Sequence, residues 1–249
     1  MAHLYLNEQL TDAASGSLVS ILGEEARHAV AVSRVRVGET LSIGNGRGLV
    51  VSGAVVEAMA ARLSIEAADI LRTPAPAPMV TLVQALAKGG RDELAIQAAT
   101  ELGVDAVIPW AAQRSIVRWD GTKALKGQQR WANIVREATK QSLRAWIPNV
   151  SDQHTTAELA RRAGSVRMLV LEPTAADALT SIGLTSVAAE RDERDLILVV
   201  GPEGGVAPAE LDTLVGAGAR AVRLGDTVLR TSTAGPAAIA ALNGALGRW

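Results

Sequence analysis

Short apolar runs alternate with helical stretches from residue 80 onward, and this alternation limits the possible fold more than any other feature of the chain. The runs are rich in β-branched residues and cover 80–86, 104–108, 167–171, 196–200 and 221–224. Apolar strands separated by helices are typical of a mainly parallel sheet with helices on both faces. We therefore predict an α/β domain with a mainly parallel sheet over residues 79–249.

Local signals place helices between these strands. Asp92 is a predicted N-cap for a helix over 93–102, and Gly103 is the predicted end of that helix. Pro208 suits the first turn of another helix. A helical pattern over 233–246 is strongly apolar, so we expect this helix to be buried in the domain or against a partner subunit.

Residues 1–72 have a different pattern, which predicts a small β-barrel or β-rich domain. A short helical stretch is expected at 24–32, and the glycines of 44–48 suit a hairpin turn. Alternating prolines at 73–78 favour an extended, semi-rigid linker to the second domain. The β-like segments of the first domain are 4–6, 40–43, 49–56 and 62–70.

The composition excludes several kinds of site. The 249 residues include no cysteine, which excludes disulfides, thiolate metal ligands and a cysteine nucleophile. The three histidines are scattered along the chain rather than spaced as metal ligands. No apolar run reaches the roughly 18 residues of a membrane span, and the N-terminus lacks the pattern of a signal peptide. We expect a cytoplasmic protein without a membrane segment or a metal.

Positive charge is concentrated in one part of the chain. The formal net charge is −1, which by itself argues against a nucleic-acid partner. Between Trp110 and Trp146, however, eight Lys or Arg residues accompany only Asp120 and Glu137. A polyanion responds to local charge rather than to the total, so this segment is a candidate contact for nucleic acid.

Three loops follow buried strands of the predicted parallel sheet. A glycine-rich loop at 201–205 follows one strand, a loop at 224–234 follows the next, and Leu171-Glu-Pro-Thr174 ends a third. The carboxyl ends of parallel strands meet at one edge of the sheet, where α/β proteins bind small ligands. We expect these loops together to enclose a molecule the size of a nucleoside.

Other interpretations of the glycine-rich loop remain. It lacks the Lys-Ser/Thr ending of a P-loop and the G-x-G-x-x-G spacing of a dinucleotide fold, which disfavours a nucleotide-dependent dehydrogenase or transferase. An ordinary tight turn is the simplest alternative. If a ligand binds, the glycines allow its close approach to backbone groups.

Arg230 is the candidate for direct chemistry. It lies between apolar Leu229 and the predicted final helix, where an arginine can bind phosphate or stabilise negative charge on a substrate. The alternative is a surface arginine next to a helix that is capped by one of the hydroxyls at 231–233.

The helix predicted over 128–144 has two faces. Trp131, Ile134, Val135 and Ala138 form an apolar stripe at helical spacing. The opposite stripe is basic and is either a solvated face or, together with Arg114 and Arg118 upstream, an RNA contact. Its members are Arg136, Lys140 and Arg144.

Taken together, these motifs resemble those of the SPOUT class of methyltransferases. More narrowly, the chain resembles the bacterial 16S ribosomal RNA uridine-N3 methyltransferase family (RsmE type), and the resemblance covers essentially the whole chain. The matching segments are Lys88, 99–104, 113–118, 130–148, 201–205, 224–225 and 229–234, with His28 and 34–38 in the N-terminal part.

The resemblance implies a trefoil-knotted SPOUT domain preceded by a PUA-like RNA-binding domain. It implies methylation of N3 of a specific uridine in the 16S ribosomal RNA of the small ribosomal subunit, with S-adenosyl-L-methionine as the methyl donor. It also implies a homodimer with the cofactor pocket near the subunit interface. A SPOUT enzyme that methylates 2′-O-ribose and a non-catalytic RNA-binding or ribosome-assembly protein remain alternatives.

The resemblance also assigns roles to residues, with Arg230 as the catalytic residue that faces substrate and methyl donor. The chain departs from the family at Ser232, where glutamate is common, and at Ala98, where lysine is common. The expected cofactor-binding residues are Leu171, Glu172, Pro173, Gly201, Pro202, Glu203, Gly204, Gly205, Leu224, Gly225, Leu229, Thr231, Thr233 and Ala234. The expected RNA-binding residues are His28, Arg34, Arg36, Lys88, Arg114, Arg118, Arg136, Lys140, Gln141 and Arg144.

Overall fold

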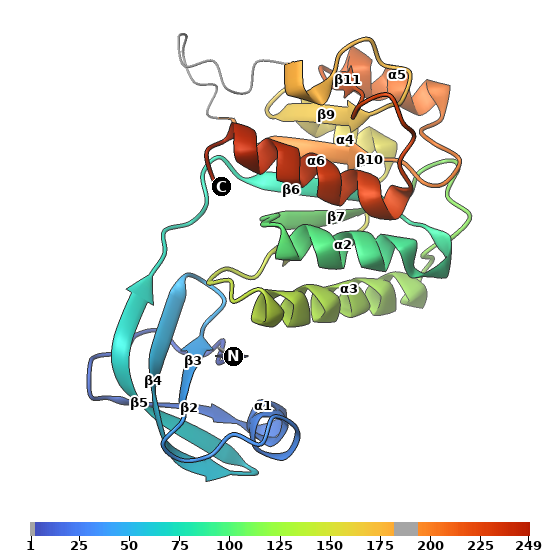
Figure 1. The fold of residues 1–249 in the computed structure, drawn as a ribbon. Helices are drawn as coiled ribbons and strands as arrows, with labels where there is room; N and C mark the ends of the chain where they lie inside the picture. Colours follow the sequence, from blue (N-terminus) through green and yellow to red (C-terminus); the bar gives the residue numbers. More distant parts are fainter. Residues whose placement is uncertain (1–2, 182–193) are drawn as a thin grey trace. The chain divides into compact units, whose positions relative to one another are not determined.

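The computed structural model describes residues 3–181 and 194–249 (Figure 1). The chain divides by its internal contacts into two units. The first comprises Met1–Ala75 and Arg136–Ile147, and the second comprises Pro76–Val135 and Pro148–Trp249. The segment 136–147 therefore groups with the N-terminal residues, whereas the sequence pattern places it in the second domain.

The first unit is built on a five-stranded sheet, as its β-rich pattern predicts. The strand order is β1-β3-β4-β5-β2; β1 and β3 are parallel, and the remaining pairs are antiparallel. The predicted helix is present as α1 (Gly23–Arg27) and a π-helical turn (His28–Val32). The strands are β1 (Leu4–Leu6), β2 (Leu18–Leu22), β3 (Thr40–Gly44), β4 (Leu49–Met59) and β5 (Arg62–Arg72).

Strand β2 was not predicted. Its ends, Leu18 and Leu22, are exposed, and it continues into α1 through Gly23, which has a φ of +61°. Leucines on the exposed face hide the alternation that marks a half-buried strand. The predicted hairpin turn joins β3 to β4, and there Gly48 has a φ of +93°; a Cβ on it would lie 2.3 Å from the carbonyl oxygen of Thr73.

The second unit contains a six-stranded sheet in which every pair is parallel, with the order β11-β9-β10-β6-β7-β8. This confirms the predicted α/β fold with a mainly parallel sheet. The strands are β6 (Val80–Ala85), β7 (Ala106–Trp110), β8 (Asn149–Val150), β9 (Arg167–Leu171), β10 (Leu196–Val200) and β11 (Arg220–Val222).

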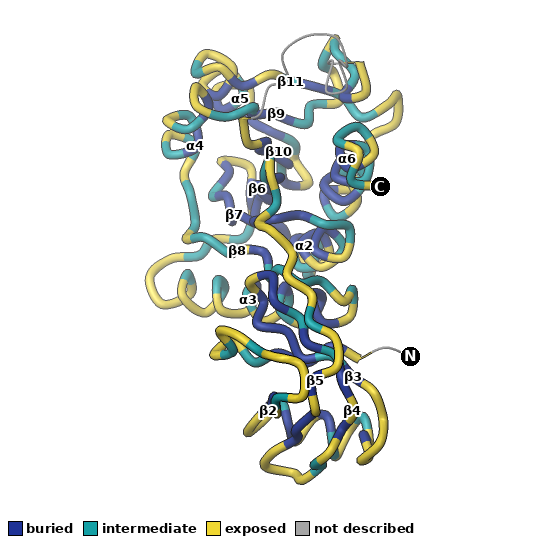
Figure 2. Tube along the Cα trace, turned by 90° about the vertical axis from the view of Figure 1, so that its left-hand side faces the viewer, coloured by how far each residue is buried: buried dark blue, intermediate teal, exposed yellow. Residues whose placement is uncertain are grey.

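Helices cover both faces of this sheet, and its strands are buried between them (Figures 1 and 2). Helices α2 and α6 pack against each other on one face, and α4 and α5 lie on the other. Every residue of β6, β7 and β10 is buried. The helices are α2 (Arg91–Glu101), α3 (Thr122–Gln141), α4 (Thr156–Ala163), α5 (Pro208–Gly216) and α6 (Thr231–Ala245).

Two predicted helix caps are wrong. The N-cap of α2 is Gly90, and Asp92 is buried within the first turn, where its Oδ2 accepts a hydrogen bond from the backbone N–H of Ala87 at 3.1 Å. The N-cap residue of α6 is Arg230, which makes no side-chain cap; Thr231 is the first helical residue, and its hydroxyl bonds the carbonyl of Gly201. The predicted end of α2 is confirmed, since Gly103 has a φ of +99°.

Helix α3 starts and ends earlier than predicted, and its apolar stripe is confirmed. Trp131, Val135 and Ala138 are buried and Ile134 is half-buried. The Trp119 and Trp131 rings meet edge to face, with centroids 5.3 Å apart. A Cβ on Gly127 would lie 2.4 Å from the Trp119 ring, so only glycine fits there.

The trefoil knot stays a prediction. The path from β9 to β10 includes residues 182–193, which lie outside the described residues. Among the described helices, none combines the length and the apolar character needed to span a membrane.

Candidate functional site

The three predicted loops meet around a cavity of about 400 Å³ in the second unit. They follow β9, β10 and β11, whose parallel arrangement brings their carboxyl ends to one edge of the sheet. A cavity of this size suits a small organic ligand. The predicted residues that line it are Leu171, Glu172, Pro173, Gly201, Pro202, Glu203, Gly205, Leu224, Gly225, Leu229, Arg230, Thr231 and Ala234.

Two predicted cofactor residues lie outside the lining, namely Gly204 and Thr233. The carbonyl of Gly204 accepts a hydrogen bond from Arg114, and a Cβ on Gly204 would lie 3.4 Å from the Cβ of Arg114. A side chain at this position would therefore meet Arg114 first. Thr233 is exposed on α6.

Five further residues line the cavity and were not predicted. Val200 and Val206 flank the glycine-rich loop, and Thr227 and Val228 lie between the two predicted parts of the third loop. Arg91 comes from the start of α2, far away in the sequence. Only its position shortly after the carboxyl end of β6 could have indicated it.

An ion pair holds the middle of the glycine-rich loop. Glu203 accepts hydrogen bonds from the Arg91 guanidinium at 2.8 Å and from the backbone N–H of Lys88 at 3.2 Å. Burial alone would raise the pKa of the Glu203 carboxyl, but hydrogen bonds from its own backbone, Arg91 and Lys88 outweigh burial and hold that pKa below its usual range. Glu203 is therefore an anion at neutral pH and a poor proton acceptor.

Arg114 holds the same loop from another side. Its Nη1 donates to the carbonyl of Gly204 at 2.8 Å and to that of Val206 at 3.4 Å. Arg118 likewise donates to the carbonyls of Ala112 and Gln113, both at 2.9 Å. These two predicted RNA-binding residues thus hold backbone in place in this structure.

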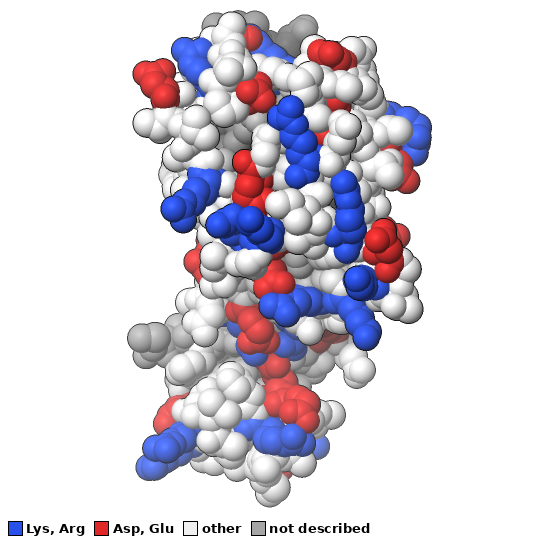
Figure 3. All heavy atoms as spheres, turned by 90° about the vertical axis from the view of Figure 1, so that its right-hand side faces the viewer, with Lys and Arg blue, Asp and Glu red and all other residues white. Residues whose placement is uncertain are grey.

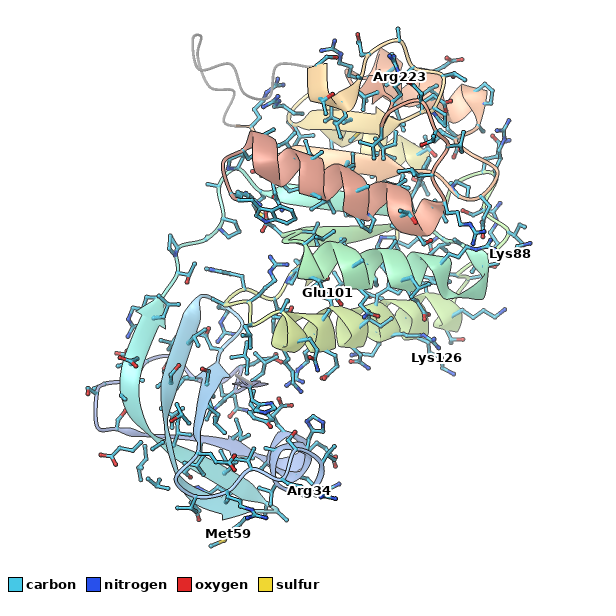
Figure 4. All side chains as sticks on the ribbon, in the orientation of Figure 1. Arg34, Met59, Lys88, Glu101, Lys126 and Arg223 are labelled. Atoms are coloured by element: carbon cyan, nitrogen blue, oxygen red, sulfur yellow. The ribbon has the colours of Figure 1, made fainter. Side chains whose placement is uncertain are left out.

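Arg230 has a different environment. Its side chain is exposed, lines the cavity and makes no hydrogen bond or ion pair with another residue of the described ranges. Lys88 is also exposed, and its ammonium has no partner within the same ranges. Figure 4 shows Lys88 at the edge of the second unit where the loops lie, and Figure 3 shows Lys and Arg side chains on that side of the unit with Asp and Glu side chains between them.

The predicted basic stripe on α3 is not a solvated face. Lys140 is only 8% exposed, and its ammonium pairs with Glu25 at 3.0 Å and Glu137 at 3.1 Å. Arg136 pairs with Glu25 at 3.1 Å and Glu8 at 3.2 Å. We call these five residues the Glu25 network; all of them belong to the first unit.

The other predicted RNA-binding residues of the first unit are accessible to differing degrees. His28, Arg34 and Arg36 are exposed, and Arg34 has a φ of +56°. Gln141 is exposed and Arg144 is half-buried. Within residues 3–181 and 194–249, no cluster of three His, Asp or Glu side chains is arranged to hold a metal ion.

Comparisons with known proteins agree with this architecture. A family model for an RNA methyltransferase domain matches residues 73–243. Ribosomal RNA small subunit methyltransferase E of Mycobacterium tuberculosis is 41% identical to this chain over 100% of it and 94% of that protein. The protein of the same name from Bacillus subtilis is 32% identical over 90% and 89%.

A solved structure is also similar. The crystal structure of a ribosomal RNA small subunit methyltransferase E from Neisseria gonorrhoeae, bound to S-adenosyl methionine, matches with a TM-score of 0.84 and 29% identity. The match covers 98% of each chain.

Proposed function

Because this chain belongs to the RNA methyltransferase family, we propose that it transfers a methyl group from S-adenosyl-L-methionine to N3 of a specific uridine in 16S ribosomal RNA. The observation that supports this most directly is the cavity itself. Three strand-end loops enclose it, and Arg230 faces it without another partner in the described residues. The named relatives act on small-subunit ribosomal RNA, and one was crystallised with the same cofactor.

The residues around the cavity fit such a cofactor. Apolar Leu171, Pro173 and Val228 offer surface to an adenine ring, while the backbone of 201–205 offers hydrogen-bonding groups. Gly205 and Gly225 have φ angles of +71° and +76°, so the loops adopt turns that favour glycine and bring backbone close to a ligand. When bound, the cofactor supplies a methyl group already activated by a sulfonium.

The protein therefore has to position the base and stabilise charge. A uridine at the cavity must be held with N3 in line with the methyl group, and such positioning can supply much of the rate enhancement. N3 gives up its proton to water, and the negative charge left on the base spreads onto the flanking carbonyl oxygens until N3 takes the methyl group. The guanidinium of Arg230 stabilises those oxygens and orients the flipped base.

Replacing Arg230 tests this role. We expect Arg230→Ala to lower kcat by about 10²–10³-fold, the usual effect of losing one charge-stabilising donor, and to leave cofactor affinity within a few-fold. Single-turnover kinetics and calorimetry measure the two quantities. Arg220→Ala is the matched control, because Arg220, which lies on β11, pairs with Asp177 and does not line the cavity. Full activity of Arg230→Ala would remove Arg230 from the mechanism.

The proposal extends to the partners. Exposed His28, Arg34, Arg36 and Lys88 contact RNA, while Arg136 and Lys140 are committed to the Glu25 network. The protein acts in the cytoplasm on the small ribosomal subunit. It forms a homodimer through the face of α2 and α6 that points away from the sheet, where Leu94 is 59% exposed.

A further inference from the structure

Gln84 lies behind the cavity, near the carboxyl end of β6, and is 0% exposed. Its side-chain Nε2 donates to the hydroxyl of Thr231 at 2.8 Å and to the carbonyl of Ala85 at 3.1 Å. The Thr231 hydroxyl lies 2.7 Å from the carbonyl oxygen of Gly201. Gln84, Thr231 and Gly201 are therefore joined by two consecutive hydrogen bonds.

The direction of these bonds follows from the chemistry of the groups. A carbonyl only accepts, so the single hydroxyl proton of Thr231 points to Gly201. The Thr231 oxygen must then accept from Gln84, and the bond from Nε2 to the Ala85 carbonyl independently places the amide nitrogen on that side. Buried hydrogen bonds in series polarise and strengthen one another.

These bonds connect three parts of the site that come from distant parts of the sequence. Gly201 is the first residue of the glycine-rich loop, and Thr231 follows Arg230 and lines the cavity. A Cβ on Gly201 would lie 3.0 Å from Val206, so the turn itself favours glycine. A glycine cannot hold its own peptide orientation with a side chain, and here the Thr231 hydroxyl does so.

We propose that Gln84 and Thr231 are positioning residues, which hold the first peptide of the 201–205 loop and the backbone of Arg230 in the arrangement that binds cofactor. The inference rests on the proposed function. The Thr231 hydroxyl is committed to Gln84 and Gly201, so it supports the cofactor loop, in contrast to the direct contact expected from the sequence.

The test compares variants that remove one bond at a time. Thr231→Val removes the hydroxyl at nearly constant volume, and Thr231→Ser retains it. Gln84→Met removes the Nε2 donor, and with it the bonds to the Thr231 hydroxyl and to the Ala85 carbonyl; Gln84 Oε1 has no hydrogen-bond partner among the described residues, so no bond is lost from that atom. Thr100→Val is the control, since Thr100 is also buried and its hydroxyl bonds the Ile96 carbonyl within α2 at 2.7 Å.

Calorimetry with S-adenosylmethionine and the KM and kcat for methyl transfer provide the readouts. We expect Thr231→Val to weaken cofactor affinity about tenfold, as for loss of one buried hydrogen bond, and Thr231→Ser to stay within about twofold. Gln84→Met weakens it several-fold, and the double variant is little worse than Thr231→Val, because both substitutions break the same connection. Thr100→Val lowers the melting temperature without changing KM.

Three results would overturn the inference: unchanged affinity in folded Thr231→Val, equal losses in Thr231→Ser and Thr231→Val, or fully additive losses in the double variant. If Thr231→Val does not fold, Gln84→Met and Thr231→Ser decide the question alone. Failure of the unaltered protein to bind S-adenosylmethionine would instead overturn the proposed function, and the inference with it.

Discussion

Arg114 carries a positive charge beside the cavity, but its guanidinium is already bonded to the carbonyls of Gly204 and Val206. Lys88 lies at the same edge of the sheet with an exposed ammonium that has no partner in the described ranges. The two side chains have the same charge and different surroundings. At the scale of single residues, their contacts therefore assign them different roles.

We expect Arg114→Ala to raise the KM for S-adenosylmethionine about tenfold, because the cofactor loop loses its hydrogen bonds on one side. Lys88→Ala should leave that KM unchanged and reduce the salt dependence of RNA binding by about one unit of slope, as for one lost phosphate contact. Steady-state kinetics and binding measured across salt concentrations separate the two effects. The opposite pattern would show that Arg114 is the phosphate contact.

The end of α3 is the element whose role differs most from its sequence pattern. Arg136 and Lys140 have the spacing of a solvated basic stripe, but Glu25 accepts from both of them and from the backbone N–H of Leu6 at 3.1 Å. Burial alone would raise the pKa of Glu25; the charges of Arg136 and Lys140 outweigh it and hold that pKa below the ordinary value of 4.5. The network thus fastens this helix end within the first unit.

Glu25→Gln should lower the free energy of unfolding by about 2 kcal/mol at neutral pH, because a neutral amide replaces a buried paired carboxylate. A lowered pKa means that the stabilisation is fully present above pH 4.5 and is lost as the pH falls through the folded-state value. The difference in the free energy of unfolding between the variant and the parent should therefore become smaller below pH 4.5. Urea denaturation from pH 7 downward measures it, and a constant difference would contradict the account. Glu24→Gln, in an exposed pair with Arg27, is the control.

Leu143, just beyond α3, offers a second test of this helix end. It has a φ of +56° and is 49% exposed, so its backbone is in a conformation that favours glycine and its side chain buries little surface. Leu143→Gly should raise the free energy of unfolding by about 1 kcal/mol. Leu125→Gly, inside α3 and 70% exposed, should lower it by about the same amount. If both substitutions changed the free energy of unfolding in the same direction, the backbone of Leu143 would not be under strain.

Sequence reasoning succeeded where the signal is local. Buried apolar runs that end in a loop, glycine-rich after β10 and Glu-Pro-containing after β9, identified these two strands and the cavity between their ends. It missed Arg91 and Gln84, whose partners lie 112 and 147 residues away, and it could not separate a solvated stripe from a paired one. Arg136 meets Glu25 across 111 residues, a distance that helical spacing does not encode.

At the scale of the whole molecule, the proposed homodimer depends on the outer face of α2 and α6. Leu94→Asp should convert the dimer to a monomer in sedimentation equilibrium, because a charge at an apolar interface is buried without a partner. Leu125 is likewise exposed but lies on α3, outside the proposed interface, so Leu125→Asp should leave the dimer intact. A parent protein that sediments as a monomer would contradict the proposed interface.

The methylated nucleoside that forms distinguishes the proposed reaction from its alternatives. Small ribosomal subunits from cells lacking this gene are incubated with the protein and labelled S-adenosylmethionine, and the RNA is digested to nucleosides. We expect label in 3-methyluridine, with little label when Arg230→Ala replaces the parent. Label in a 2′-O-methyl nucleoside, or no transfer by a protein that binds the cofactor, would contradict the proposed reaction.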